Sequence, residues 1–174
     1  MSIKQFNGVY DKREDRILFR FNTHDDQEFR FWLTRFITKG ILSAVDQLMQ
    51  KGLETKHNSQ IAEVIKEFQK DTVAKTTKTN ENYLGAQNTP LGEHPILVSA
   101  MNFNLLGDTF GMDFKLPDNK TLNIKLPTQS MQGMALLLRK LSVNAQWGIS
   151  DEAETATSGT ATVDPAGSKT NAIH

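Results

Sequence analysis

Two stretches of this sequence, residues 17–48 and 110–141, follow the same pattern of apolar and polar residues without a gap, at an offset of 93 residues. In each stretch apolar residues first alternate with polar ones and then recur at every third or fourth position. Alternation predicts half-buried strands, and the wider spacing predicts a helix. Five of the 32 aligned pairs are identical. Because a slip of one residue would turn every strand side chain to the opposite face, the gapless match favours an internal duplication. The alternative is that any two strand–turn–strand–helix units look alike.

The alternating segments predict two antiparallel hairpins. In the first, residues 17–22 and 28–34 flank a turn rich in aspartate, and in the second, residues 110–116 and 122–126 flank Pro117-Asp118-Asn119-Lys120. A third strand is expected before each hairpin, over Ile3–Tyr10 and Ile96–Leu105. Asn7-Gly8 could form a hairpin turn, but a strand with a bulge at Gly8 fits better, since residues 11–15 offer a more polar turn.

Helical spacing follows each hairpin. It predicts a helix from about Thr34 to about Lys51, ending near Gly52, and another over the segment from Met131 to Leu141. Gly40 and Gly133 fall at equivalent places in these helices, which suggests close packing there. Between the units, Asn58-Ser59 can cap a helix with an apolar stripe that fades at residues 76–77, and residues 78–95 are polar and rich in Gly and Pro, which is typical of a linker.

The predicted fold class is therefore α+β: two tandem β-β-β-α units of antiparallel sheet with helices packed on the apolar faces, and an extra helix between them. The expected organisation is a first unit over residues 1–57, a linking helix and polar linker over 58–95, a second unit over 96–149, and a disordered acidic tail over 150–174. The tail holds one Val, one Ile and no aromatic residue, which is too little apolar surface to offset its ordering entropy.

Composition removes several classes of function. The chain of 174 residues has no cysteine, which excludes disulfides, thiolate zinc sites, iron–sulfur clusters and thiol nucleophiles. Its formal charge is zero, divided into +3 up to residue 149 and −3 in the last 25 residues. A balanced charge argues against a nucleic-acid coat or a membrane-surface protein, and no apolar run reaches the length of a membrane span. With no secretory signal pattern at the N-terminus, we expect a cytoplasmic location.

No pattern of catalytic or metal-ligating residues stands out. The four histidines, His24, His57, His94 and His174, are never three or four residues apart, so no helix carries a two-histidine metal site. There is neither a glycine-rich phosphate loop nor a nucleophile elbow around a serine. We therefore expect a protein that is not an enzyme and that uses no metal or other cofactor.

The best candidate binding residues lie on the polar face of the first hairpin. Arg20, Arg30 and Trp32 share that face, and Lys115 and Lys125 occupy comparable positions in the second hairpin. Cations beside an exposed indole suit single-stranded nucleic acid, because the cations take phosphates and the indole stacks on a base. A solvated sheet face with cross-strand Arg–Glu pairs through Glu28 would explain the same residues, as would burial of Trp32 beneath helices.

The repeated strand–strand–strand–helix order resembles, in outline, the duplicated sheet-plus-helix single-strand binders of the Whirly and PUR kind. The resemblance implies a sheet-based fold and brings no motif that matches residue by residue, so no site residue is transferred. The functional expectation is a small non-catalytic interaction or adaptor protein, whose sheet edges invite a protein partner or self-association. The alternative is a single-stranded nucleic-acid-binding protein that uses the Arg/Trp face.

Overall fold

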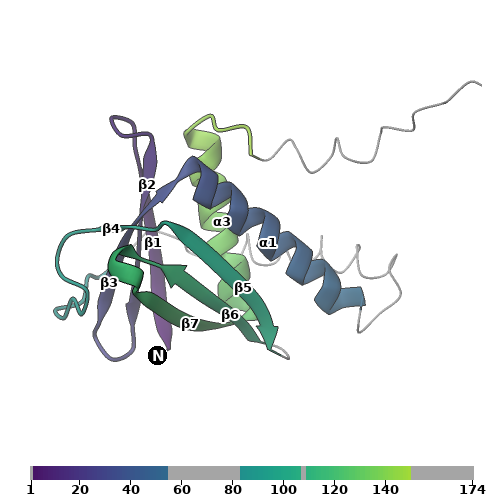
Figure 1. The fold of residues 1–174 in the computed structure, drawn as a ribbon, viewed down its shortest axis with the longest axis horizontal. Helices are drawn as coiled ribbons and strands as arrows, with labels where there is room; N and C mark the ends of the chain where they lie inside the picture. The colour runs from purple at the N-terminus through teal and green to yellow at the C-terminus, as the bar shows by residue number, and fades with distance from the viewer. Residues whose placement is uncertain (1, 55–82, 107–108, 150–174) are drawn as a thin grey trace, which may run out of the picture.

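The first predicted hairpin forms the centre of a four-stranded sheet (Figure 1). The computed structural model describes residues 2–54, 83–106 and 109–149, and within them the fold is α+β, as predicted. The first sheet has the order β1-β2-β3-β4, with antiparallel pairing between the first three strands and parallel pairing of β4 with β3. Its strands are β1 (Ile3–Asp11), β2 (Arg16–Thr23), β3 (Glu28–Thr34) and β4 (Ile96–Leu97).

The second hairpin belongs to a separate, three-stranded antiparallel sheet with the order β5-β6-β7. Its strands are β5 (Ala100–Leu106), β6 (Thr109–Lys115) and β7 (Thr121–Pro127), with the short helix η1 (Pro117–Asn119) in the predicted turn. Asp118 and Asn119 both adopt positive φ angles, of 58° and 57°. Asp and Asn tolerate this left-handed conformation better than other non-glycine residues, which explains why they serve as the turn.

The single strand predicted over Ile96–Leu105 is wrong, because the chain changes sheets within it. Ile96 and Leu97 pair with β3, and the backbone N–H of Val98 donates to the carbonyl of Trp32 at 3.1 Å. The next residue, Ser99, already donates to the carbonyl of Lys115 in the second sheet at 3.0 Å. A continuous apolar run therefore serves two sheets, a distinction that period-two reasoning does not make.

The bulge predicted at Gly8 is also wrong. Gly8 pairs regularly with Phe19, and the irregular register of β1 lies between Ile3 and Gln5. The glycine is needed for another reason: a Cβ atom on Gly8 would lie 2.5 Å from Cδ1 of Leu141. The absent side chain lets the second helix approach β1 closely.

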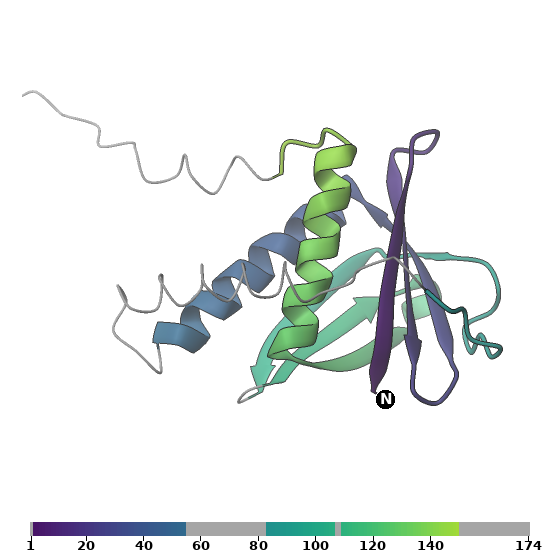
Figure 2. The ribbon, with the colours of Figure 1, turned by 180° about the vertical axis from the view of Figure 1, so that it is seen from behind.

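Two long helices follow the two hairpins, α1 (Arg35–Glu54) and α3 (Thr128–Asn144). The first continues past Gly52, so this glycine does not end it as predicted. Gly40 is exposed, and a Cβ atom there would meet nothing within 4 Å, so the close packing inferred for Gly40 is wrong; Gly133 is buried. The two helices pack against each other, and both views show them side by side (Figures 1 and 2).

Each helix also packs against the first strand of the other unit, α1 against β5 and α3 against β1. Where the helices meet, one Nη2 atom of Arg139 lies 2.7 Å from each carboxylate oxygen of Asp46.

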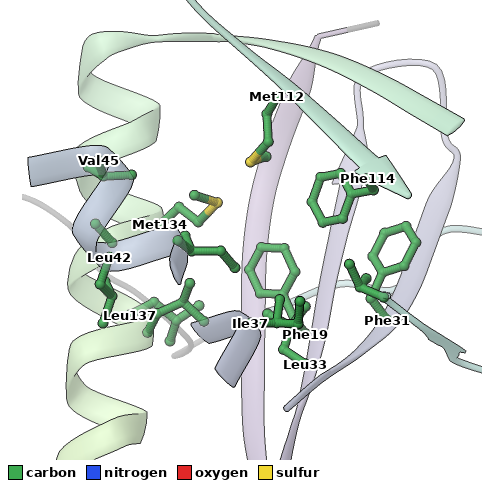
Figure 3. Close-up of a cluster of buried hydrophobic side chains, with 14 of the residues drawn as sticks. Phe19, Phe31, Leu33, Ile37, Leu42, Val45, Met112, Phe114, Met134 and Leu137 are labelled. Carbon is green, nitrogen blue, oxygen red and sulfur yellow. The ribbon is translucent and has the colours of Figure 1, made fainter. Parts of the chain in front are cut away.

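One hydrophobic core joins both sheets and both helices. Phe31 of the first sheet stacks on Phe114 of the second, with ring centroids 4.9 Å apart and an interplanar angle of 20°. Figure 3 shows these rings facing each other, with Leu42 and Val45 of α1 and Met134 of α3 in the same cluster. The inner faces of the sheets are thus turned toward each other and the helices, which leaves two outer faces as surfaces.

Two predictions concern residues outside the described ranges. These are the helix beginning at Asn58-Ser59 and the acidic tail over residues 150–174. The linker predicted over 78–95 falls partly within the description, from residue 83 onward, and that part lies on the first sheet.

Candidate interaction surface on the outer face of the first sheet

Strand register determines which residues form the outer face of the first sheet. Arg20 pairs with Asn7 on one side and with Arg30 on the other, and Leu18 pairs with Trp32. Because neighbours in register point to the same face, the predicted trio of Arg20, Arg30 and Trp32 shares this face, as the alternation indicates. One half of the face is polar, and the other half is apolar.

The polar half is covered by residues 83–93, which we call the strap. The strap lies on the outer-face side chains through its backbone. Asn22 Nδ2 donates to the carbonyl oxygen of Leu84 at 2.6 Å, and Glu28 Oε2 accepts from the backbone N–H of Ala86 at 3.0 Å. The strap thus satisfies polar side chains that the sheet would otherwise present to solvent.

Glu28 is the central anchor of the strap and is only 1% exposed. Its Oε1 accepts a bond of 2.7 Å from Arg30 Nε, and Arg30 Nη1 donates to the carbonyl oxygen of Glu93 at 2.8 Å. A buried carboxylate is tolerable only when it is paired and hydrogen-bonded, and Arg30 supplies the pairing. The Arg30–Glu28 pair lies within β3 rather than across strands, and it commits Arg30 to the strap.

Arg20 is engaged in the same way. Its Nε and Nη2 atoms donate to Asn7 Oδ1 at 3.0 and 2.6 Å, and its guanidinium lies 5.0 Å from the ring centroid of Tyr83 in the strap. Burial raises the pKa of the Tyr83 hydroxyl, and the negative charge of Glu28 raises it further. The tyrosine therefore remains neutral and acts as an aromatic platform under the cation.

Trp32 is half-buried, and a cation already lies over its ring. The guanidinium carbon of Arg16 is 4.1 Å from the ring centroid, and Arg16 also forms an ion pair with Glu14. The stacking position predicted for a nucleobase is thus occupied by a side chain of the protein itself.

Next to the strap, an apolar row crosses the whole sheet with one residue on each strand. Val9 pairs with Leu18, Leu18 with Trp32, and Trp32 with Leu97. The end residues Val9 and Leu97 are 49% and 45% exposed. A contiguous exposed row of this kind is typical of an interaction site, whereas single exposed apolar residues are normal on any surface. Sequence reasoning placed Leu18 on this face but overlooked the row, because Leu97 joins the sheet only through β4.

Lys115 and Lys125 lie on a different surface, the outer face of the second sheet. Lys115 Nζ donates to Thr121 Oγ1 at 3.0 Å, and Lys125 is exposed. The neighbouring Asn123 donates to Asp113. The five predicted residues therefore divide between two outer faces, and the structure does not bring the lysines together with Trp32.

A second polar cluster, which sequence reasoning missed, links the β1–β2 turn to the residues after α3. Asp15 accepts hydrogen bonds of 2.7 Å from both Trp147 Nε1 and Tyr10 Oη. These two bonds lower the pKa of the Asp15 carboxyl, the bond from Trp147 contributing most, while the bond to Asp15 raises the pKa of Tyr10. Trp147 is 2% exposed, so this contact fastens the end of the second unit to the first hairpin. No local pattern signals a contact between residues 132 positions apart.

Comparisons with known proteins return no match to a family model, a curated protein or a solved structure. In the described ranges, no group of three or more His, Asp or Glu residues could hold a metal ion. The helices of the described part are too short or too polar to cross a membrane.

Proposed function

We propose that this protein is a non-catalytic interaction module, built from a duplicated β-β-β-α unit, that binds a protein partner through the apolar row Val9, Leu18, Trp32 and Leu97. The observation that carries the proposal is the row itself: apolar side chains in register across all four strands, half exposed at both ends. A central Trp with a stacked Arg at its edge is the composition expected of an energetic centre in a protein interface.

Strand register supports the duplication. Arg16 pairs with Thr34 in the first sheet, and residues 93 positions later, Thr109 and Pro127, pair in the second. The β6–β7 ladder thus repeats the β2–β3 ladder residue by residue. The preceding strand is shifted by two residues, because β5 connects to β6 through a turn two residues shorter than the β1–β2 turn.

The contact between the helices supports the same proposal. Asp46 and Arg139 are 93 positions apart, so the offset that aligns the two units also pairs these residues in space. A residue that touches its own equivalent lies on a twofold axis. The exchange of partners between helices and first strands, α1 with β5 and α3 with β1, is what such an axis requires.

The arginines favour a protein partner over single-stranded nucleic acid. Arg16, Arg20 and Arg30 each hold a partner within the chain, an acidic side chain, an amide or a carbonyl group. Binding to phosphates would require these contacts to be given up, whereas the apolar row is available without rearrangement.

The test is site-specific photo-crosslinking with the full chain in an extract of its native cells. A photoreactive residue at position 97 should yield a discrete protein adduct that survives nuclease treatment. Unlabelled chain should suppress the adduct, and a Val9→Lys/Leu97→Lys double variant should not. Position 106 is the matched control, since Leu106 is 48% exposed on the second sheet. Equal labelling from both positions, or an adduct that requires nucleic acid, would overturn the proposal.

A further inference from the structure

We infer that the partner of the apolar row is a second copy of this chain, so that the protein forms a twofold dimer through the outer faces of two first sheets. This inference rests on the proposed function and specifies its partner. Three features of the described residues support it: the straightness of the row, the one-sided position of the strap, and the balance of charge.

The row is suited to contact with itself. Strands in a sheet lie about 4.8 Å apart, so four registered residues span roughly 14 Å in a straight line. In an isologous contact the same patch serves both copies. When the twofold axis lies along the row, Trp32 meets Trp32 and Leu97 meets Leu97 of the second copy, and both exposed ends, Val9 and Leu97, are buried at once.

The strap selects this axis over the one at right angles. It lies above the sheet on one side of the row only, held by Asn22, Glu28 and Arg30. An axis parallel to the strands would set strap against strap and hold the two rows apart. An axis along the row sets the strap of each copy over the uncovered side of the other, so that raised and bare halves fit together. The backbone of the strap then forms a polar rim beside an apolar centre.

Charge does not oppose self-association. The chain carries 20 basic and 20 acidic residues, so two copies experience no net repulsion. The uncovered side of the row also carries both signs, with Arg16 beside Asp11 in register and Glu14 paired with Arg16. A strongly charged partner would find no matching field on this face, whereas a second copy meets an equally balanced surface.

Absence of native cysteine provides a direct test in the full chain. In a Leu97→Cys variant, the two introduced thiols face each other across the axis and should form an intermolecular disulfide under mild oxidation with copper–phenanthroline. A disulfide requires Cβ atoms within about 4.5 Å of each other, so the reaction reports geometry rather than collision. Leu106→Cys is the matched control, because Leu106 is 48% exposed but lies on the second sheet.

Sedimentation velocity of the cysteine-free chain supplies the independent measurement, over concentrations from about 1 μM to about 1 mM, which cover moderate and weak contacts. The native chain should show a monomer–dimer equilibrium. Leu97→Lys should raise the dissociation constant by roughly tenfold or more, since the substitution occurs twice in the contact and buries a charge, and Leu106→Lys should leave it unchanged. Circular dichroism verifies that both lysine variants are folded, and Leu97→Met should retain the dimer.

A native chain that stays monomeric throughout this range overturns the inference, as does a dimer that Leu97→Lys leaves intact. Disulfide formation that is equally fast at positions 97 and 106 also overturns it. A photo-adduct at position 97 whose mass identifies a different protein refutes the second copy as partner while the proposed function stands, so the two failures are distinguishable.

Discussion

Exchanging the charges of Asp46 and Arg139 tests whether the two units are related by a twofold axis. The pair joins α1 to α3 with N–O distances of 2.7 Å, and its side chains are 28% and 32% exposed. Exposure of about a third screens the interaction, so we assign it about 1 kcal/mol of coupling, near the upper end for surface pairs. Asp46→Arg alone replaces attraction by repulsion and should lower the free energy of unfolding by about 1–2 kcal/mol.

The double variant Asp46→Arg/Arg139→Asp is the informative one. Near a twofold axis the two positions have equivalent surroundings, so the exchanged pair should restore stability to within about 0.5 kcal/mol of the native chain. The measurement is urea denaturation of the four members of the cycle at low salt, repeated at 1 M NaCl, where a Debye length of about 3 Å should reduce the differences. If the double variant loses the sum of the two single losses, the positions are not equivalent and the duplication argument from this pair fails.

Three further variants test packing and anchoring at other places. Gly8→Val should lower the free energy of unfolding by about 1–3 kcal/mol in thermal denaturation despite the strand preference of Val, because its Cβ would lie 2.5 Å from Leu141; an unchanged midpoint would contradict this approach of helix and strand. The Asp15 carboxyl has a lowered pKa when folded, so its stabilising contribution is present above pH 4 or so and is lost as the pH falls through the folded value. Trp147→Phe removes the largest cause of that shift and should flatten the acid limb of the pH–stability curve, and an unaltered limb would refute the assignment. Glu28→Ala should speed amide exchange across the strap, whereas Glu28→Gln, which keeps an acceptor, should have the smaller effect; equal exchange in both would show that the carboxylate is not the anchor.

The apolar row shows how far sequence reasoning extends toward the candidate site. Alternation correctly places Leu18, Arg20 and Trp32 on one face, because side chains in a strand point to opposite sides with a period of two. It does not reveal that Arg16 covers Trp32 or that Tyr83 underlies Arg20, since both contacts depend on packing above the sheet. The predicted nucleic-acid face is thereby found to be half covered.

Local patterning by itself determined the strands, the turns at residues 11–15 and 117–120, the two long helices and the α+β class. These features depend on the spacing of neighbouring residues, and spacing can be read from the chain. Only the tertiary structure decided that residues 96–106 serve two sheets, that residues 83–93 form a strap, and that Arg139 meets Asp46. Contacts between distant residues are selected by the shape and charge of surfaces that do not exist until the units pack together.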